Sequence, residues 1–160
     1  ADIACIAIAG TGSIIRLWKA EGTSDLASET IGKADRGGTE ICCAVFSPSG
    51  SSLATCSDSR RGNGSTVALY ELEIMTKTQS VIMPGFFPSH IAVSLDSKQL
   101  VIGDHKGRIR LFQTDDFSIQ RDMDTTGAAT AQAVRSAAFD PTCRILAVGG
   151  QDGRLELRSL

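Results

Sequence analysis

The 160-residue chain lacks several features that mark particular classes of protein. No run approaches the roughly 18–20 apolar residues that span a bilayer, and no basic segment precedes an apolar run as it does in a signal peptide. The 16 Lys and Arg nearly balance the 18 Asp and Glu, so no basic excess supports non-specific binding to nucleic acid. We therefore expect neither a membrane nor nucleic acid among its partners.

Residues for metal or cofactor chemistry are also scarce. The chain has two histidines, no CxxC spacing among its five cysteines and no paired-carboxylate spacing, so neither a zinc site nor a metallohydrolase is indicated. We expect no catalytic residue, no cofactor and no metal. Most of the cysteines stand in apolar, strand-like runs, where a free thiol behaves as a small buried hydrophobe. Unpaired thiols predict an intracellular protein, cytoplasmic or nuclear.

Proline (4) and aromatic residues (5%) are few, whereas glycine is frequent (16). Many turns without many prolines indicate short strands joined by tight turns. Four segments run from a Gly-rich turn into alternating residues and end on a Leu followed by Trp18, Tyr70, Phe112 or Arg158. These ends are 52, 42 and 46 residues apart, which is near the period of a four-stranded repeat unit.

The interior of the repeat is visible in three further segments. AVFSPSGSSLATCS (44–57), IAVSLDSKQLVIGD (91–104) and AAFDPTCRILAVGG (137–150) align without gaps. In each, an apolar strand is followed by a turn and a second apolar strand. The first strands end at Phe46, Val93 and Phe139, and the second strands begin near Leu53, Leu100 and Leu146. Near-continuous apolar runs of this kind fit strands that are covered on both faces.

The combined pattern, V…FSP.G..LA…G..DG.(I/V).LW, resembles the WD-repeat family of β-propellers over nearly the whole chain. The resemblance implies an all-β fold of four-stranded antiparallel blades, about 3.5 to 4 of them in an incomplete ring. It divides residues 1–160 into a partial blade at 1–31 and three further blades at 40–83, 90–123 and 133–160. The repeats are degenerate, because only Trp18 keeps the family tryptophan and only Asp152 keeps the turn aspartate. The family's Asp–His–Ser/Thr–Trp hydrogen-bond network therefore cannot form in full, and we expect packing to hold the blades together.

The same template predicts where the strands lie. It places them at 40–46, 52–56, 66–72 and 79–83 in the second blade, 90–94, 99–102, 108–113 and 118–123 in the third, and 133–139, 145–149 and 154–158 in the fourth. One side of the arc, the long-loop face, then collects the loops 11–13, 32–39, 57–65, 84–89, 104–107, 124–132 and 151–153. The opposite side, the short-turn face, collects the turns 47–51, 95–98 and 140–144. In this family the long-loop side often holds the partner-binding surface.

Two loops on the long-loop face carry candidate partner-binding residues. The insertion SDSRRGNGS (57–65) contains Arg60, Arg61 and Asn63, and paired arginines can grip a carboxylate or a phosphate. The alternative is a solvated polar loop. The segment PGFFPSH (84–90) carries Phe86 and Phe87, which could anchor a partner because aromatic residues are enriched at binding hot spots. The alternative is that one ring plugs the central channel or covers a junction between blades.

Two turns on the same face supply the remaining candidates. Asp104, His105 and Lys106 place an acid, an imidazole and an amine on one turn, and Asp152 lies in the corresponding turn of the last repeat. No Ser or Cys nucleophile is placed beside the first cluster, so a polar turn that caps a hairpin is the alternative to a functional one. His90, at the start of an innermost strand, is expected to be packed or hydrogen-bonded rather than a metal ligand.

These observations support three hypotheses about function. The first is a non-catalytic scaffold that presents loops to protein partners within a larger chain or complex. The second is a propeller enzyme acting on a small molecule in the central channel, and the third is a structural subunit of a large assembly. The chain begins with Ala1, and its repeats are too few for the seven-bladed ring common in the family. We therefore expect further blades from a longer polypeptide, a second copy or another subunit.

Overall fold

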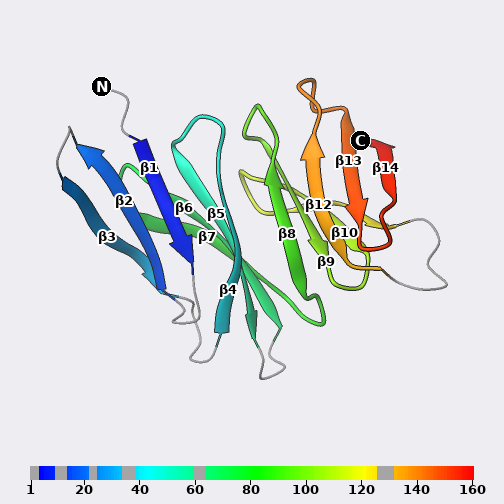
Figure 1. Ribbon diagram of the computed structural model, residues 1–160, viewed down its shortest axis with the longest axis horizontal. Helices are drawn as coiled ribbons and strands as arrows, with labels where there is room; N and C mark the ends of the chain where they lie inside the picture. Colours follow the sequence, from blue (N-terminus) through cyan, green and yellow to red (C-terminus); the bar gives the residue numbers. More distant parts are fainter. Residues whose placement is uncertain (1–3, 10–13, 22–24, 34–38, 60–63, 126–131) are drawn as a thin grey trace.

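The structure, a computed structural model, describes residues 4–9, 14–21, 25–33, 39–59, 64–125 and 132–160. These residues form four antiparallel sheets, which we number as blades 1 to 4 (Figure 1). Blade 1 contains β1 Ala4–Ala9, β2 Ile14–Glu21 and β3 Asp25–Lys33, and blade 2 contains β4 Thr39–Phe46, β5 Ser52–Ser59, β6 Ser65–Glu71 and β7 Thr76–Met83. Blade 3 contains β8 Pro88–Val93, β9 Gln99–Asp104, β10 Arg108–Gln113 and β11 Ile119–Asp124, and blade 4 contains β12 Val134–Phe139, β13 Ile145–Gly150 and β14 Leu155–Ser159. In this part of the chain, no helix is long and apolar enough to cross a membrane.

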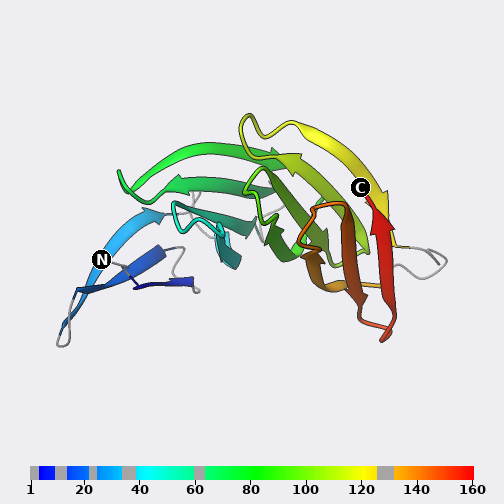
Figure 2. The same cartoon turned by 90° about the horizontal axis from the view of Figure 1, so that it is seen from above.

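The blades stand face to face along an open arc (Figure 2). Their innermost strands lie side by side, with β8 in contact with β4 and with β12, and β1 in contact with β4 (Figure 1). This arrangement confirms the predicted fold class, an all-β, incomplete ring of antiparallel propeller blades.

Among the described residues, three separate hydrophobic clusters fill the spaces between successive blades. Period-2 alternation within each strand sends neighbouring side chains to opposite faces of a blade, so one strand contributes to two clusters. On β9, Leu100 and Ile102 pack toward blade 2 whereas Val101 packs toward blade 4, and all three are fully buried. Burial on both faces explains why these strands read as continuous apolar runs in the sequence.

A β-bulge recurs at the same repeat position of three innermost strands. The pairing register skips Cys42 in β4, Ser89 in β8 and Arg135 in β12. A bulge adds one residue to a strand and redirects its side chain, and Cys42 is accordingly exposed, which corrects the prediction of a buried thiol at this position. Cys56, which lies opposite Cys43 in the register, is buried as predicted, and burial raises the pKa of its thiol.

Some strand boundaries differ from those predicted. Strand β5 continues to Ser59, into the predicted insertion, because Glu40 and Thr39 of β4 still pair with Asp58 and Ser59. Strand β8 begins at Pro88, two residues before the predicted start, at a position where a strand tolerates proline. The bounds of strands β4 and β10 agree with the predicted bounds to within one residue. The innermost strands of blades 2, 3 and 4 end at the predicted positions Phe46, Val93 and Phe139.

On the short-turn face, one carboxylate organises the turn between β12 and β13. Asp140 accepts hydrogen bonds at Oδ1 from the backbone N–H groups of Arg144 (2.8 Å) and Ile145 (2.6 Å). At Oδ2 it accepts them from the Thr142 hydroxyl (2.5 Å) and backbone N–H (3.0 Å). The Thr142 hydroxyl, together with the Ile145 amide, lowers the pKa of Asp140 from 3.8 to about 2.

We expect this carboxylate to make stability pH-dependent below about pH 4. Because the folded-state pKa lies below the ordinary value, the stabilisation is present at neutral pH and is lost as the pH falls from 3.8 toward 2. Carboxyl NMR titration should locate the Asp140 pKa near 2, and Thr142→Val should move it upward. An Asp140 pKa that Thr142→Val leaves unchanged would contradict this assignment of the cause.

Candidate protein-interaction site

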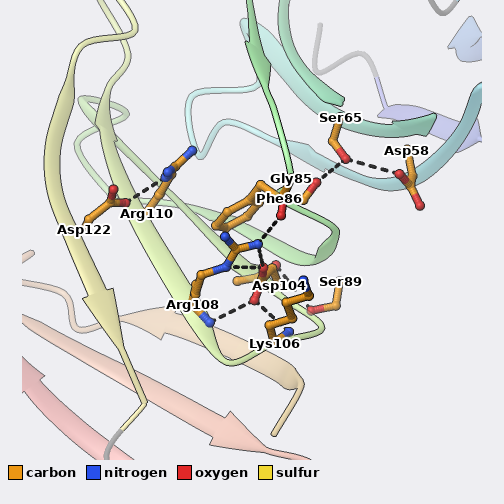
Figure 3. A network of polar contacts seen from close by, with 11 residues as sticks. Asp58, Ser65, Gly85, Phe86, Ser89, Asp104, Lys106, Arg108, Arg110 and Asp122 are labelled. Carbon is orange, nitrogen blue, oxygen red and sulfur yellow. Dashed lines mark hydrogen bonds and ion pairs between the residues drawn. The ribbon is translucent and has the colours of Figure 1, made fainter. Parts of the chain in front are cut away.

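The structure describes six of the nine predicted partner-binding residues, and these lie in two places. Arg60, Arg61 and Asn63 lie outside the described residues. Phe86, Phe87, Asp104, His105 and Lys106 come together where the segment before β8 meets the turn between β9 and β10. Figure 3 shows three of them, Phe86, Asp104 and Lys106. Asp152 lies apart from them, in the exposed turn between β13 and β14 of the next blade.

Phe86 is buried in the junction between blades 2 and 3, with 1% of its surface exposed. The guanidinium groups of Arg108 and Arg110 each lie 5.0 Å from the centroid of its ring, a distance at which a cation is attracted to an aromatic face. The backbone carbonyl of Phe86 accepts a 2.5 Å hydrogen bond from the buried Ser65 hydroxyl. The Phe86 ring therefore covers the junction between blades 2 and 3, which is the second of the two roles that the sequence left open. Its burial does not support a role as an anchor for a partner.

Asp104 is also buried, with no exposed surface, and it holds the turn that follows β9. Its Oδ1 accepts hydrogen bonds of 2.8 Å from the backbone N–H groups of Lys106 and Arg108. Its Oδ2 accepts a 2.8 Å hydrogen bond from Nε of Arg108 and forms an ion pair of 2.6 Å with Nη2. The same Nη2 donates to the backbone carbonyl of Gly85, so Asp104 and Arg108 join the turn to the segment that carries both phenylalanines.

Phe87, His105 and Lys106 remain on the outside of this braced turn, and we call them the Phe87 surface. Phe87 is 36% exposed, and Nζ of Lys106 lies 5.2 Å from the centroid of its ring. The backbone N–H of His105 donates a 3.0 Å hydrogen bond to the carbonyl of Phe87, and the side chains of His105 and Lys106 are exposed. An aromatic ring, an imidazole and an ammonium group are thus held together at one exposed point.

The second arginine of β10 also has an acidic partner. Nε of Arg110 donates a 2.8 Å hydrogen bond to Asp122 on β11 (Figure 3). A hollow of about 260 Å³ lies beside this pair and is lined by Arg108, Arg110, Asp122, Met123 and Asp124. Since both arginines are already paired with carboxylates, the hollow offers no uncompensated positive charge to an anion.

The two arginines that cover Phe86 were not among the predicted site residues, although the sequence held a signal. Alternation in RIRLF predicts that Arg108 and Arg110 point to the same side of their strand, and their contacts with Phe86 confirm it. Nothing in the residue pattern indicates that the aromatic ring beside them comes from the segment between β7 and β8.

His90 is hydrogen-bonded, as predicted, rather than free to hold a ligand. Its Nε2 lies 3.2 Å from the backbone carbonyl oxygen of Ala137 in blade 4. In the described part of the chain, no three His, Cys, Asp or Glu residues lie close enough together to hold a metal ion.

Comparisons with known proteins agree with the propeller fold described above. Residues 32–61 and 123–157 match the family model of the WD domain, G-beta repeat. A chain in the solved "Crystal Structure of Mitotic Checkpoint Complex" is similar in fold, with a TM-score of 0.77 and 18% identity. The similarity covers 99% of this chain and 45% of that one, so this chain spans less than half the length of the other. No curated protein matches. The two matched segments carry the repeat pattern of the WD domain, and the open arc of antiparallel blades has the fold of a partial β-propeller.

Proposed function

We propose that the chain is a non-catalytic scaffold that binds a protein partner through the Phe87 surface. The observation that carries this proposal is an exposed aromatic ring, Phe87, beside a turn whose residues are held by hydrogen bonds and an ion pair. Asp104, Arg108 and Phe86 are engaged with one another beneath Phe87, so little conformational freedom remains for a partner to remove. A preorganised aromatic residue loses less entropy on binding than a mobile one.

The chemistry of the Phe87 surface fits a protein partner. Aromatic residues are enriched at the centres of protein interfaces, where polar groups form the rim. Phe87 supplies the apolar contact, and His105 and Lys106 supply donors beside it. The free thiols of the described cysteines, Cys42, Cys43, Cys56 and Cys143, support an intracellular location for this activity, cytoplasmic or nuclear.

The two alternative functions have less support. An enzyme in the central channel would need reactive groups on several innermost strands, whereas His90 is engaged with the backbone of the neighbouring blade. A structural subunit of a large assembly would use the same surfaces as the scaffold and differ only in the permanence of its contacts. The similar chain in the mitotic checkpoint complex is one component of an assembly, which makes both protein-binding roles reasonable for this fold.

The double variant Phe87→Ala/Lys106→Ala should lose a partner that the unchanged chain captures from a cell extract. We expect a loss of about tenfold or more for at least one protein, since removing an aromatic hot-spot residue typically costs 2 kcal/mol or more. Mass spectrometry of the captured proteins measures this. The matched control is Leu95→Ala, because Leu95 is 59% exposed on the short-turn face, at the opposite end of β8.

Thermal unfolding should show that both variants remain folded, because Leu95 and Lys106 are exposed and Phe87 lies outside the three hydrophobic clusters. Equal capture of every protein by the double variant and the Leu95→Ala control would remove the Phe87 surface from the proposal.

A further inference from the structure

A groove of about 360 Å³ lies at the junction between blades 2 and 3, on the short-turn face. Blade 2 lines it with the start of β5, the end of β6 and the first half of β7, and blade 3 lines it with the end of β8 and the turn after β10. Ser47 and Ser97, from the turns that follow β4 and β8, complete its walls. The Phe87 surface lies on the opposite, long-loop face.

Small side chains leave this space between the two blades. Ser52 and Ala54 of β5 face blade 3, because alternate residues of a strand share one face. At the junction between blades 3 and 4, the same repeat positions hold the longer residues Gln99 and Val101. The groove therefore follows from two short side chains at one level of β5.

The groove has an apolar part. Ala54 is 1% exposed and belongs to the hydrophobic cluster between blades 2 and 3, and the partly buried Leu69 and Val93 pack against that cluster. All three line the groove. Such a lining suits the methylene stem of a long polar side chain, which packs on apolar surface while its charged end stays among polar groups.

The hydroxyl groups that line the groove present acceptors to a ligand. The Thr78 hydroxyl donates a 3.2 Å hydrogen bond to the backbone carbonyl of Leu69. The Thr114 hydroxyl donates one of 2.8 Å to the backbone carbonyl of Ser97. A hydroxyl has a single proton to donate, so with these bonds in place both groups can only accept a further hydrogen bond.

The groove is also negatively charged. Glu71 and Asp115 line it, and no Lys, Arg or His is among its described lining residues. Glu71 is half-buried, and within the described residues it forms no ion pair. Gln79 donates a 2.5 Å hydrogen bond from Nε2 to the backbone carbonyl of Asp115, which leaves its Oε1 as one more acceptor. Lys98, in the turn after β8, is exposed and does not line the groove.

We propose that this groove binds an arginine side chain of a protein partner. The aliphatic stem packs on Ala54, Leu69 and Val93, and the guanidinium group lies beside Glu71. Arginine has five N–H donors in a planar fork, which matches acceptors on two facing walls, whereas a lysine ammonium group is a compact charge with three donors. The groove and the Phe87 surface lie on opposite faces, so either can bind a partner without the other.

The test titrates the blocked peptide acetyl-Gly-Arg-Gly-amide into the full chain and follows the backbone amide signals by NMR. We expect saturable shifts at Thr78, Gln79 and Asp115. The same peptide with citrulline, which has nearly the shape of arginine without its charge, should bind about tenfold more weakly. The lysine peptide should fall between the two.

Glu71→Gln should weaken binding of the arginine peptide by about fivefold or more, because a charge-assisted hydrogen bond becomes a neutral one. The matched control is Glu73→Gln, which removes the same charge from an exposed residue outside the groove, two positions along the chain. It should bind like the unchanged chain, and so should Phe87→Ala. Thr78→Lys, at an exposed position of β7, places a competing cation in the groove and should abolish binding.

Three results would overturn the proposal. One is the absence of saturable shifts at the groove in the unchanged chain. Another is equal affinity for the arginine and citrulline peptides, or equal affinity of Glu71→Gln and Glu73→Gln for the arginine peptide. The third is tighter binding of free arginine than of the blocked peptide, which would assign the groove to a small molecule.

Discussion

Gly103→Ala should destabilise the chain by about 3 kcal/mol, the upper part of the range for forcing extra atoms into a packed core. The new Cβ would lie 2.3 Å from Cγ1 and 2.5 Å from Cβ of Val134. Val134 cannot easily withdraw, because its side chain is fully buried and its backbone carbonyl accepts a 2.6 Å hydrogen bond from Ser89. Urea denaturation followed by circular dichroism measures the free energy of unfolding.

The control for this prediction is Gly149→Ala, the same change one blade later. There the new Cβ meets the hydroxyl oxygen of Ser136, which can move away by rotating about one bond. We expect a change within about 1 kcal/mol, since alanine also loses less backbone entropy than glycine in a strand. If the two variants unfold at the same urea concentration, the close approach of Val134 to Gly103 is not a tight constraint.

Asp104→Ala should cost about 3 kcal/mol, because the substitution removes one partner of a largely buried ion pair. It leaves the backbone N–H groups of Lys106 and Arg108 without their acceptor and the guanidinium of Arg108 without its counter-charge. Water reaches Arg108, whose side chain is 33% exposed, so we place the cost at the lower end of the range for buried pairs. The same urea titration measures it.

Asp152→Ala provides the comparison for a surface carboxylate. Asp152 lies 3.5 Å from Nε of Arg154, and the two side chains are 31% and 68% exposed. Exposed pairs of this kind contribute about 0–1 kcal/mol, so we expect little change in stability. An Asp104→Ala variant no less stable than Asp152→Ala would show that the turn after β9 is held by something other than its buried carboxylate.

The repeat made the fold predictable from the sequence. Apolar strands ending at Phe46, Val93 and Phe139 recur in the same frame, and each is followed by a turn and a second apolar strand. One short apolar run could be a strand or part of a buried helix, but the same run and turn repeated three times indicate a strand repeat. The predicted antiparallel blades in an incomplete ring are therefore the blades of the structure.

The bulges and the burial of Phe86 were beyond sequence reasoning for physical reasons. A single extra residue shifts the alternation of a strand, and the residue pattern around Cys42 contains no mark of that shift. The position of Phe86 depends on two arginines more than twenty residues later in the chain. Two adjacent phenylalanines look equivalent in a loop, and only contacts with the neighbouring blade separate a buried ring from an exposed one.

The three hydrophobic clusters have a consequence for how the chain loses its structure. Each cluster joins only two neighbouring blades, so the folding cooperativity is that of a linear chain of units coupled to their nearest neighbours. Within the described residues, blades 2 and 3 each take part in two clusters, whereas blades 1 and 4 each take part in one. We therefore expect the described part of blades 2 and 3 to exchange its amide hydrogens more slowly than that of blades 1 and 4.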